Sequence, residues 1–166
     1  MIMHKDVHED VVKKYLSFLV EKYGMSYDHR EFKDYSPGGL GYIATYSFCN
    51  KSGCFTIIIM PQTDDGVDYV RLDSIHSLKN YILWLTADNK EEREKHKQCC
   101  KEKQVHGINV FDVEPEIWEK YEKEFLFFKN LKNPFFGWDY RNIPRALAEV
   151  IETQIQKTGQ FFGIKV

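Results

Sequence analysis

The sequence predicts an α+β fold, with a small antiparallel sheet flanked by about four to five helices. Helical hydrophobic spacing recurs near both ends of the chain, whereas the segments between residues 42 and 72 have the aromatic and β-branched composition of strands. Short turns join these segments, so we expect three to four strands connected as a meander. A length of 166 residues with 43% hydrophobic residues fits a single globular domain spanning residues 1–166.

The first predicted element is a helix from about Asp6 to Tyr23. Val12, Leu16 and Leu19 recur at spacings of three and four and form one apolar face. A glycine follows the last apolar position, where helices commonly end. From Met25 to Gly41 the periodic pattern disappears, and the stretch ends in a Pro- and Gly-rich cluster that interrupts regular structure.

The sheet is predicted to begin with a hairpin whose strands are Tyr42–Cys49 and Cys54–Met60. Both are rich in aromatic and β-branched residues, and the polar tetrapeptide between them suits a hairpin loop. A third strand is predicted over Val67–Leu72, after another polar turn. We expect the hairpin to form the centre of the sheet, with one set of alternating side chains facing the helices: Phe48, Phe55 and Ile57, or their alternates.

Helical spacing returns after the third strand, from roughly Ser77 to Thr86. The next segment, Asn89–Lys103, is almost wholly charged and can bury little apolar surface. We therefore expect residues 88–104 to form a solvated helix or a mobile arm.

Four further elements are predicted in the C-terminal part of the chain. Val105–Val113 alternates imperfectly and suits a short fourth strand, and a helix is expected from Pro115 to about Asn130. The aromatic segment Asn133–Asp139 is expected to be a loop. A final helix is predicted from Asn142 through Ile155.

Composition excludes several classes of function. The 23 Lys and Arg residues nearly balance the 25 Asp and Glu residues, whereas proteins that bind duplex DNA are usually visibly basic, so we expect no nucleic-acid partner. The longest apolar run, Phe55–Met60, is far shorter than the ~20 residues that cross a bilayer, so we expect no membrane association. The N-terminus is polar where a signal peptide would be apolar, which predicts a cytoplasmic location.

Metal binding is the sharpest chemical hypothesis that the sequence offers. Four soft ligands lie close together in the sequence: His96, Cys99, Cys100 and His106. Their spacing matches no zinc finger or ribbon, because no Cys-x-x-Cys occurs. Cys49 and Cys54 are expected to face each other across the hairpin and to pack as small apolar residues, outside any disulfide scaffold. We therefore expect no metal and no other cofactor.

Catalytic motifs are absent from the sequence, which contains neither Gly-x-Ser-x-Gly nor His-Glu-x-x-His. His76 lies near Asp73, which could orient an imidazole as a general base. Such a pair at a strand-to-helix junction is more often a capping or surface arrangement. A non-enzymatic role is therefore favoured over an enzymatic one.

Two groups of residues are candidates for binding. An acidic turn could bind a cation or meet a basic partner: Asp64, Asp65 and Asp68. An aromatic segment follows much later in the chain: Phe135, Phe136, Trp138 and Tyr140. Trp and Tyr dominate interface hot spots, whereas the alternative is that this segment plugs one end of the core.

The segment Tyr46–Ile57, which follows an N-terminal helix, resembles small uncharacterised bacterial proteins of the immunity type. The resemblance implies a protein that neutralises a toxin by binding it. We therefore expect a non-enzymatic cytoplasmic protein that binds another protein. The alternative is a small-molecule-binding or enzymatic α+β domain with a pocket between sheet and helices, and the sequence does not indicate the oligomeric state.

Overall fold

Five strands of the described residues form one antiparallel sheet whose order in space follows the chain. The strands are β1 (Ser26–Asp34), β2 (Gly41–Cys49), β3 (Cys54–Met60), β4 (Asp68–Ile75) and β5 (Phe135–Trp138). Strands β1 to β4 pair consecutively as a meander, and β5 pairs with the outer side of β4. The computed structural model describes residues 2–34, 41–60, 68–75, 77–103, 135–138 and 143–166. Its antiparallel meander with flanking helices confirms the predicted α+β fold.

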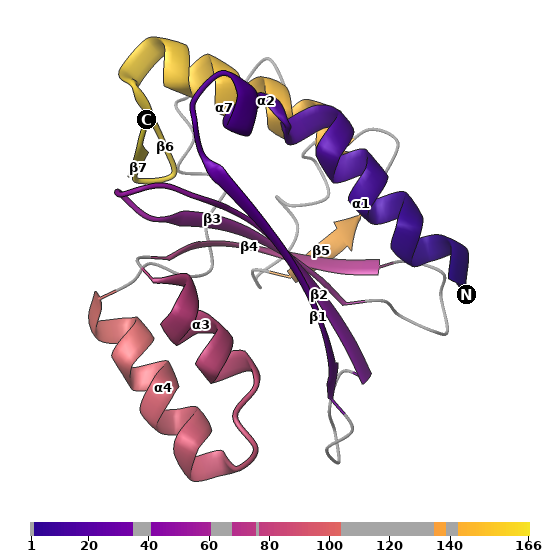
Figure 1. Ribbon diagram of the computed structural model, residues 1–166, viewed down its shortest axis with the longest axis vertical. Helices are drawn as coiled ribbons and strands as arrows, with labels where there is room; N and C mark the ends of the chain where they lie inside the picture. The colour runs from indigo at the N-terminus through magenta and orange to yellow at the C-terminus, as the bar shows by residue number, and fades with distance from the viewer. Residues whose placement is uncertain (1, 35–40, 61–67, 76, 104–134, 139–142) are drawn as a thin grey trace.

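Helices lie on both sides of the sheet (Figure 1). On one side are α1 (Ile2–Leu16), α2 (Phe18–Glu21) and α7 (Ile143–Thr158), and on the other are α3 (Leu78–Leu85) and α4 (Lys90–Lys103). We call these sides of the sheet the α1 face and the α3 face. After α7 the chain forms a small hairpin from β6 (Gln160–Phe161) and β7 (Ile164–Lys165). None of the described helices is long and apolar enough to cross a membrane.

The main core lies on the α1 face, between the sheet and α1, α2 and α7. Phe48, Phe55 and Ile57 are at most 1% exposed there, which confirms the side chains expected to face the helices. The helices contribute a matching apolar set to this core: Val12, Leu16, Leu19, Leu147, Val150, Ile151 and Ile155. Full burial of one such side chain contributes about 1.5–3 kcal/mol, so this layer anchors the helices to the hairpin. The hairpin is central, because both of its strands have neighbours on each side.

A smaller core lies on the α3 face, where alternate residues of the same strands meet α3. Ile43, Ile58 and Ile75 pack there around Tyr81, which is fully buried. Ser77 caps the start of α3 by accepting a hydrogen bond from Asn80 N at 3.5 Å. The charged segment after it is a helix, α4, whose residues 90–95 are all exposed.

The hairpin loop between β2 and β3 differs from expectation in one respect. Cys49 and Cys54 face each other as predicted, with Cα atoms 4.1 Å apart, but they form a disulfide instead of packing as free thiols. The loop also holds the C-terminal hairpin. Asn50 Nδ2 donates to Lys165 O at 2.8 Å, and Ser52 Oγ accepts from Lys165 N at 3.0 Å.

Gly53 in this loop has no room for a side chain. A Cβ atom at this position would lie 2.8 Å from Ile75 O, on the neighbouring strand β4. The residue also has a φ of +157°. The glycine therefore allows the loop to approach β4 closely, which side chains would prevent.

Several elements differ from the sequence-based prediction, including β4, which extends to Ile75, and the hairpin β6–β7, which was not predicted. Residues 26–34 form a strand, β1, where no pattern was recognised, because most of its residues are polar or charged. The predicted first helix is divided at Ser17 into α1 and α2. The aromatic segment forms strand β5 over Phe135–Trp138 instead of a loop, because its backbone pairs with β4. The expected strand 105–113 and helix 115–130 lie outside the described residues.

Candidate functional site

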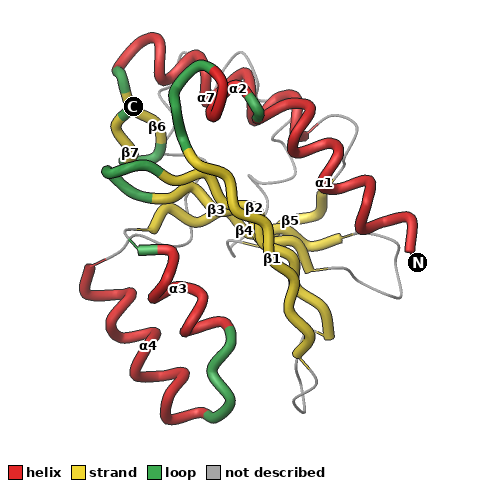
Figure 2. Tube along the Cα trace, in the orientation of Figure 1, coloured by secondary structure: helices red, strands yellow, loops and turns green. Residues whose placement is uncertain are grey.

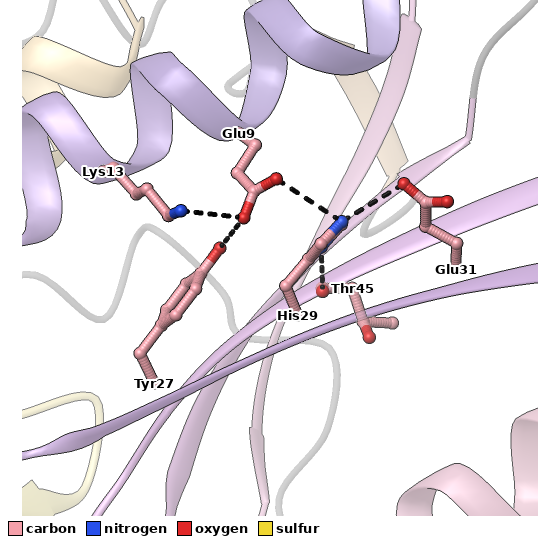
Figure 3. Close-up of polar contacts among 6 residues, drawn as sticks. All are labelled: Glu9, Lys13, Tyr27, His29, Glu31 and Thr45. Carbon is pink, nitrogen blue, oxygen red and sulfur yellow. Dashed lines mark hydrogen bonds and ion pairs between the residues drawn. The ribbon is translucent and has the colours of Figure 1, made fainter.

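A polar arrangement of five side chains joins α1 to the edge strand β1 (Figure 3). We call it the α1–β1 cluster, and it contains Glu9, Lys13, Tyr27, His29 and Glu31. The three β1 residues alternate along the strand and therefore share the α1 face. Glu9 and Lys13 are one helical turn apart and form an ion pair at 3.1 Å.

His29 is the centre of the cluster because both of its ring nitrogens have partners. Nδ1 lies 3.1 Å from Thr45 O, and since a carbonyl oxygen only accepts, this nitrogen donates. Nε2 lies 3.2 Å from Glu31 Oε1 and 3.8 Å from Glu9 Oε2. The ring stacks on Tyr46 with centroids 4.6 Å apart. His29 thus connects α1, β1 and β2 through one side chain.

The carboxylate of Glu9 connects the remaining members. Its Oε1 accepts from Tyr27 OH at 3.3 Å and from the Lys13 ammonium. Burial raises the pKa of Glu9, but the Lys13 hydrogen bond and the nearby His29 and Lys13 charges outweigh burial and hold the pKa below its ordinary value. Burial, and then the negative charge of Glu9, raise the pKa of Tyr27 well above its usual range.

These contacts favour a structural role for the α1–β1 cluster. A general base needs a nitrogen lone pair facing a substrate, but the two nitrogens of His29 already face Thr45 and Glu31. The side chains of His29, Glu9 and Glu31 are 19%, 30% and 26% exposed, so the cluster lies at the rim of the core. We conclude that it holds α1 on the edge of the sheet.

A second polar arrangement crosses the α3 face as one row. Ser47, Thr56 and Asp73 are direct neighbours on β2, β3 and β4, and all three are fully buried. The Ser47 and Thr56 hydroxyls hydrogen-bond to each other at 3.0 Å, and Tyr81 OH donates to Asp73. Each of these buried polar side chains has a hydrogen-bond partner within the protein, which offsets the cost of removing it from water. The contacts of this row are typical of a satisfied structural network.

The predicted binding residues meet at the opposite edge of the sheet. Asp68 begins β4 and pairs in register with Trp138 of β5, while Val70 pairs with Phe136. Phe135 pairs with Arg71, so one acidic and three aromatic candidates, predicted from distant parts of the sequence, lie on adjoining strands. We call this region the β4–β5 edge. Three of the predicted residues lie outside the described residues: Asp64, Asp65 and Tyr140.

The candidate metal ligands are placed only in part. His96, Cys99 and Cys100 lie on α4, whereas His106 is outside the described residues. Within the part of the chain that the structure describes, no group of three or more His, Cys, Asp or Glu side chains is placed to hold a metal ion. The absence of a cofactor stays a prediction.

Sequence reasoning missed every member of the α1–β1 cluster. One signal was available in β1, where Tyr27, His29 and Glu31 alternate with other polar residues at the period of a strand. Their partner Glu9 could not be identified, because its position depends on how α1 crosses the sheet.

The chain has no significant match among models of known protein families, among curated proteins or among solved structures. The resemblance of residues 46–57 to immunity-type proteins therefore stays a prediction. The observed contacts are the basis for a functional interpretation.

Proposed function

We propose that this chain is a non-enzymatic protein that binds another protein through its β4–β5 edge. The observation that carries this proposal is the register pairing of Asp68 with Trp138. It places an acidic residue next to a segment rich in aromatic residues, at the end of the sheet. Trp residues at the centre of an interface commonly supply much of its binding energy.

The position of β5 supports this proposal. β5 is the last strand in the sheet, and among the described residues no further strand pairs with it. The free edge of a strand offers backbone donors and acceptors to an extended segment of a partner. The four residues Phe135–Trp138 contain no charge, which would otherwise discourage such pairing.

Charge suggests the character of the partner. Asp68 lies on this edge, as does the basic residue Arg71, which pairs with Phe135, and the sequence contains further aspartates at positions 64, 65 and 139. An acidic surface speeds association with a basic partner and opposes acidic competitors. A basic protein toxin fits this description, in agreement with the resemblance to immunity proteins.

A cytoplasmic location belongs to the same proposal and has a chemical consequence. Cytoplasmic thiols are kept reduced, whereas disulfides persist in oxidising compartments. In the cytoplasm Cys49 and Cys54 would therefore face each other as thiols. The pairing of β2 with β3 does not depend on that bond, since the register continues along both strands.

The alternative function, a small-molecule-binding or enzymatic domain, has less support. Its best basis is the buried row that contains Ser47, Thr56 and Asp73. The two hydroxyls bond to each other, and Asp73 accepts from Tyr81. A ligand would have to displace contacts that are already made, so we favour protein binding.

Photo-crosslinking in cells of the source organism tests the proposal. Benzoylphenylalanine replaces Phe136 on β5, and in a matched control it replaces Leu83, which is 40% exposed on α3. We expect light to join one specific protein to the chain from position 136 only. Equal adducts from both positions, or none from position 136, would contradict binding at the β4–β5 edge.

A further inference from the structure

The outer edge of β1 has a charge pattern that is complementary to itself. Residues 30–34 are Arg30, Glu31, Phe32, Lys33 and Asp34, so positions at equal distances on either side of Phe32 have opposite charges. β1 is the first strand in the sheet, and within the described ranges no strand pairs with its outer side. The pattern therefore lies on an edge strand of the sheet that the described residues form.

We propose that this edge binds a second copy of the same chain, with the two β1 strands antiparallel and Phe32 on the two-fold axis. Glu31 then lies opposite Lys33 of the second copy, and Arg30 lies opposite Asp34. Symmetry repeats both pairs on the other side of the axis. Opposite charges directly across an antiparallel pair stabilise it, so each charged residue of this segment has a favourable neighbour.

The backbone of β1 supports the same register. Asn50 N donates to Gly53 O at 2.9 Å, which makes these residues a hydrogen-bonded pair of the β2–β3 hairpin. Alternation along β2 then directs the backbone groups of its odd-numbered residues toward β1. Their β1 partners are Ser26, Asp28, Arg30 and Phe32. The backbone groups that point outward therefore belong to the residues between them, including Glu31 and Lys33.

This direction of the backbone groups fits the two-fold arrangement. Glu31 and Lys33 of the second copy exchange both of their backbone hydrogen bonds, and the symmetric pair does the same. The Phe32 residues form a non-hydrogen-bonded pair, in which side chains lie closest together. Phe32 is half-buried at the edge of the α3-face core, so pairing would cover its remaining exposed surface.

Charge also excludes neighbouring registers. If Glu31 or Arg30 lay on the axis instead of Phe32, like charges would face each other and destabilise the pair. Charged residues usually protect edge strands from pairing, and here they leave one favourable register. The Arg30 side chain is 49% exposed, and its Nε donates to Asp28 at 3.0 Å.

The described contacts of β1 with α1 lie away from the proposed interface. The α1–β1 cluster ties α1 to Tyr27 and His29, nearer the start of the strand. The end of β1 that carries Arg30 to Asp34 projects away from α1, α2 and α7 (Figure 2). The interface is distinct from the β4–β5 edge and does not depend on the proposed function.

Analytical ultracentrifugation of the purified full chain tests this proposal, over about 1–300 μM, a range suited to a small interface. We expect a reversible dimer. Arg30→Asp and Asp34→Arg each convert two opposite-charge pairs into like-charge pairs, so each should raise the dissociation constant about tenfold or more. Lys79→Asp, a charge reversal at an exposed site on α3, is the matched control and should leave it unchanged.

Mixing the two variants gives the sharpest result. When an Arg30→Asp chain meets an Asp34→Arg chain, opposite charges face each other again at both places. The mixture should therefore form a heterodimer at concentrations where each variant alone is monomeric, and the double variant should dimerise like the wild type. A wild-type chain that stays monomeric, or a dimer unaffected by either reversal, would overturn the proposal.

Discussion

At one edge of the sheet β1 runs for nine mostly polar or charged residues, whereas at the other edge β5 runs for four residues without a charge. The α1–β1 cluster fastens β1 to a helix through His29 and Glu9. β5 pairs with β4, where Asp68 is the neighbour of Trp138. The two edge strands of the described sheet therefore differ in composition.

The difference teaches how an edge strand can select what it binds. A mixed pattern of charges permits few registers, since a shift brings like charges together, and therefore suits a copy of itself. An apolar edge accepts any complementary extended segment and obtains its affinity from aromatic anchors. These properties are the basis for proposing self-association at β1 and partner binding at β5.

The largest expected effect comes from truncating the aromatic anchor of the β4–β5 edge. Trp138→Ala should weaken partner binding by about 2 kcal/mol or more and leave the melting temperature nearly unchanged. If the segment instead plugs the core, the same change should lower the free energy of unfolding by about 3–5 kcal/mol. Thermal melts, together with a binding titration against the partner identified by crosslinking, distinguish a binding role from a core role. A large drop in melting temperature would contradict binding at the β4–β5 edge.

A smaller effect is expected at the β1 edge when its connection to α1 is removed. Glu9→Ala removes the hydrogen-bond acceptor of Tyr27 OH and the ion-pair partner of His29, so we expect a loss of about 1–2 kcal/mol in the free energy of unfolding. Asp10→Ala, at an exposed position on the same helix, is the control and should have little effect. Urea unfolding measures both, and equal effects would show that the cluster does not hold α1.

The pH dependence of stability gives a second test of the contribution of Glu9 to the α1–β1 cluster. Because the folded-state pKa of Glu9 lies below its ordinary value, its ionised form stabilises the fold. This contribution is complete above the ordinary pKa and is lost as the pH falls through the folded-state pKa. The stability difference between wild type and Glu9→Gln should therefore shrink from about pH 6 to about pH 3. A difference that stays constant over this range would refute the assignment.

The smallest effect is expected away from both edges, on α4. Glu91→Ala, Glu92→Ala or Lys95→Ala should each change the free energy of unfolding by no more than ~0.5 kcal/mol, because these residues are exposed. Urea unfolding again provides the measurement. A loss of several kcal/mol would mean that α4 is buried in an assembly.

The accuracy of the sequence-based predictions follows the strength of local signals. β3 was predicted with its observed limits because a run of β-branched and aromatic residues lies between Gly53 and Pro61. β1 was missed because charged residues are poor strand formers in general, whereas in the structure Tyr27 and His29 of this strand have a partner on α1. Local pattern alone could not supply that partner.

The candidate site was predictable only as separate pieces. The chemistry of Asp68 and Trp138 was evident from residue type, but their proximity depends on the pairing of β5 with β4. The intervening stretch of chain is too long for sequence spacing to indicate that pairing. The self-complementary charges of β1 became visible only once the strand and its free edge were known.

Hydrogen–deuterium exchange tests binding at the β4–β5 edge most directly. It is measured on the non-covalent complex with the partner that crosslinking identifies. The experiment is run below the concentration at which the chain associates with itself, so that protection of β1 by a second copy does not contribute. We predict that the partner slows exchange of the amides of Phe135–Trp138 and leaves those of Ser26–Asp34 unchanged. Protection confined to β1 or α4, or an unchanged β5, would contradict binding at the β4–β5 edge.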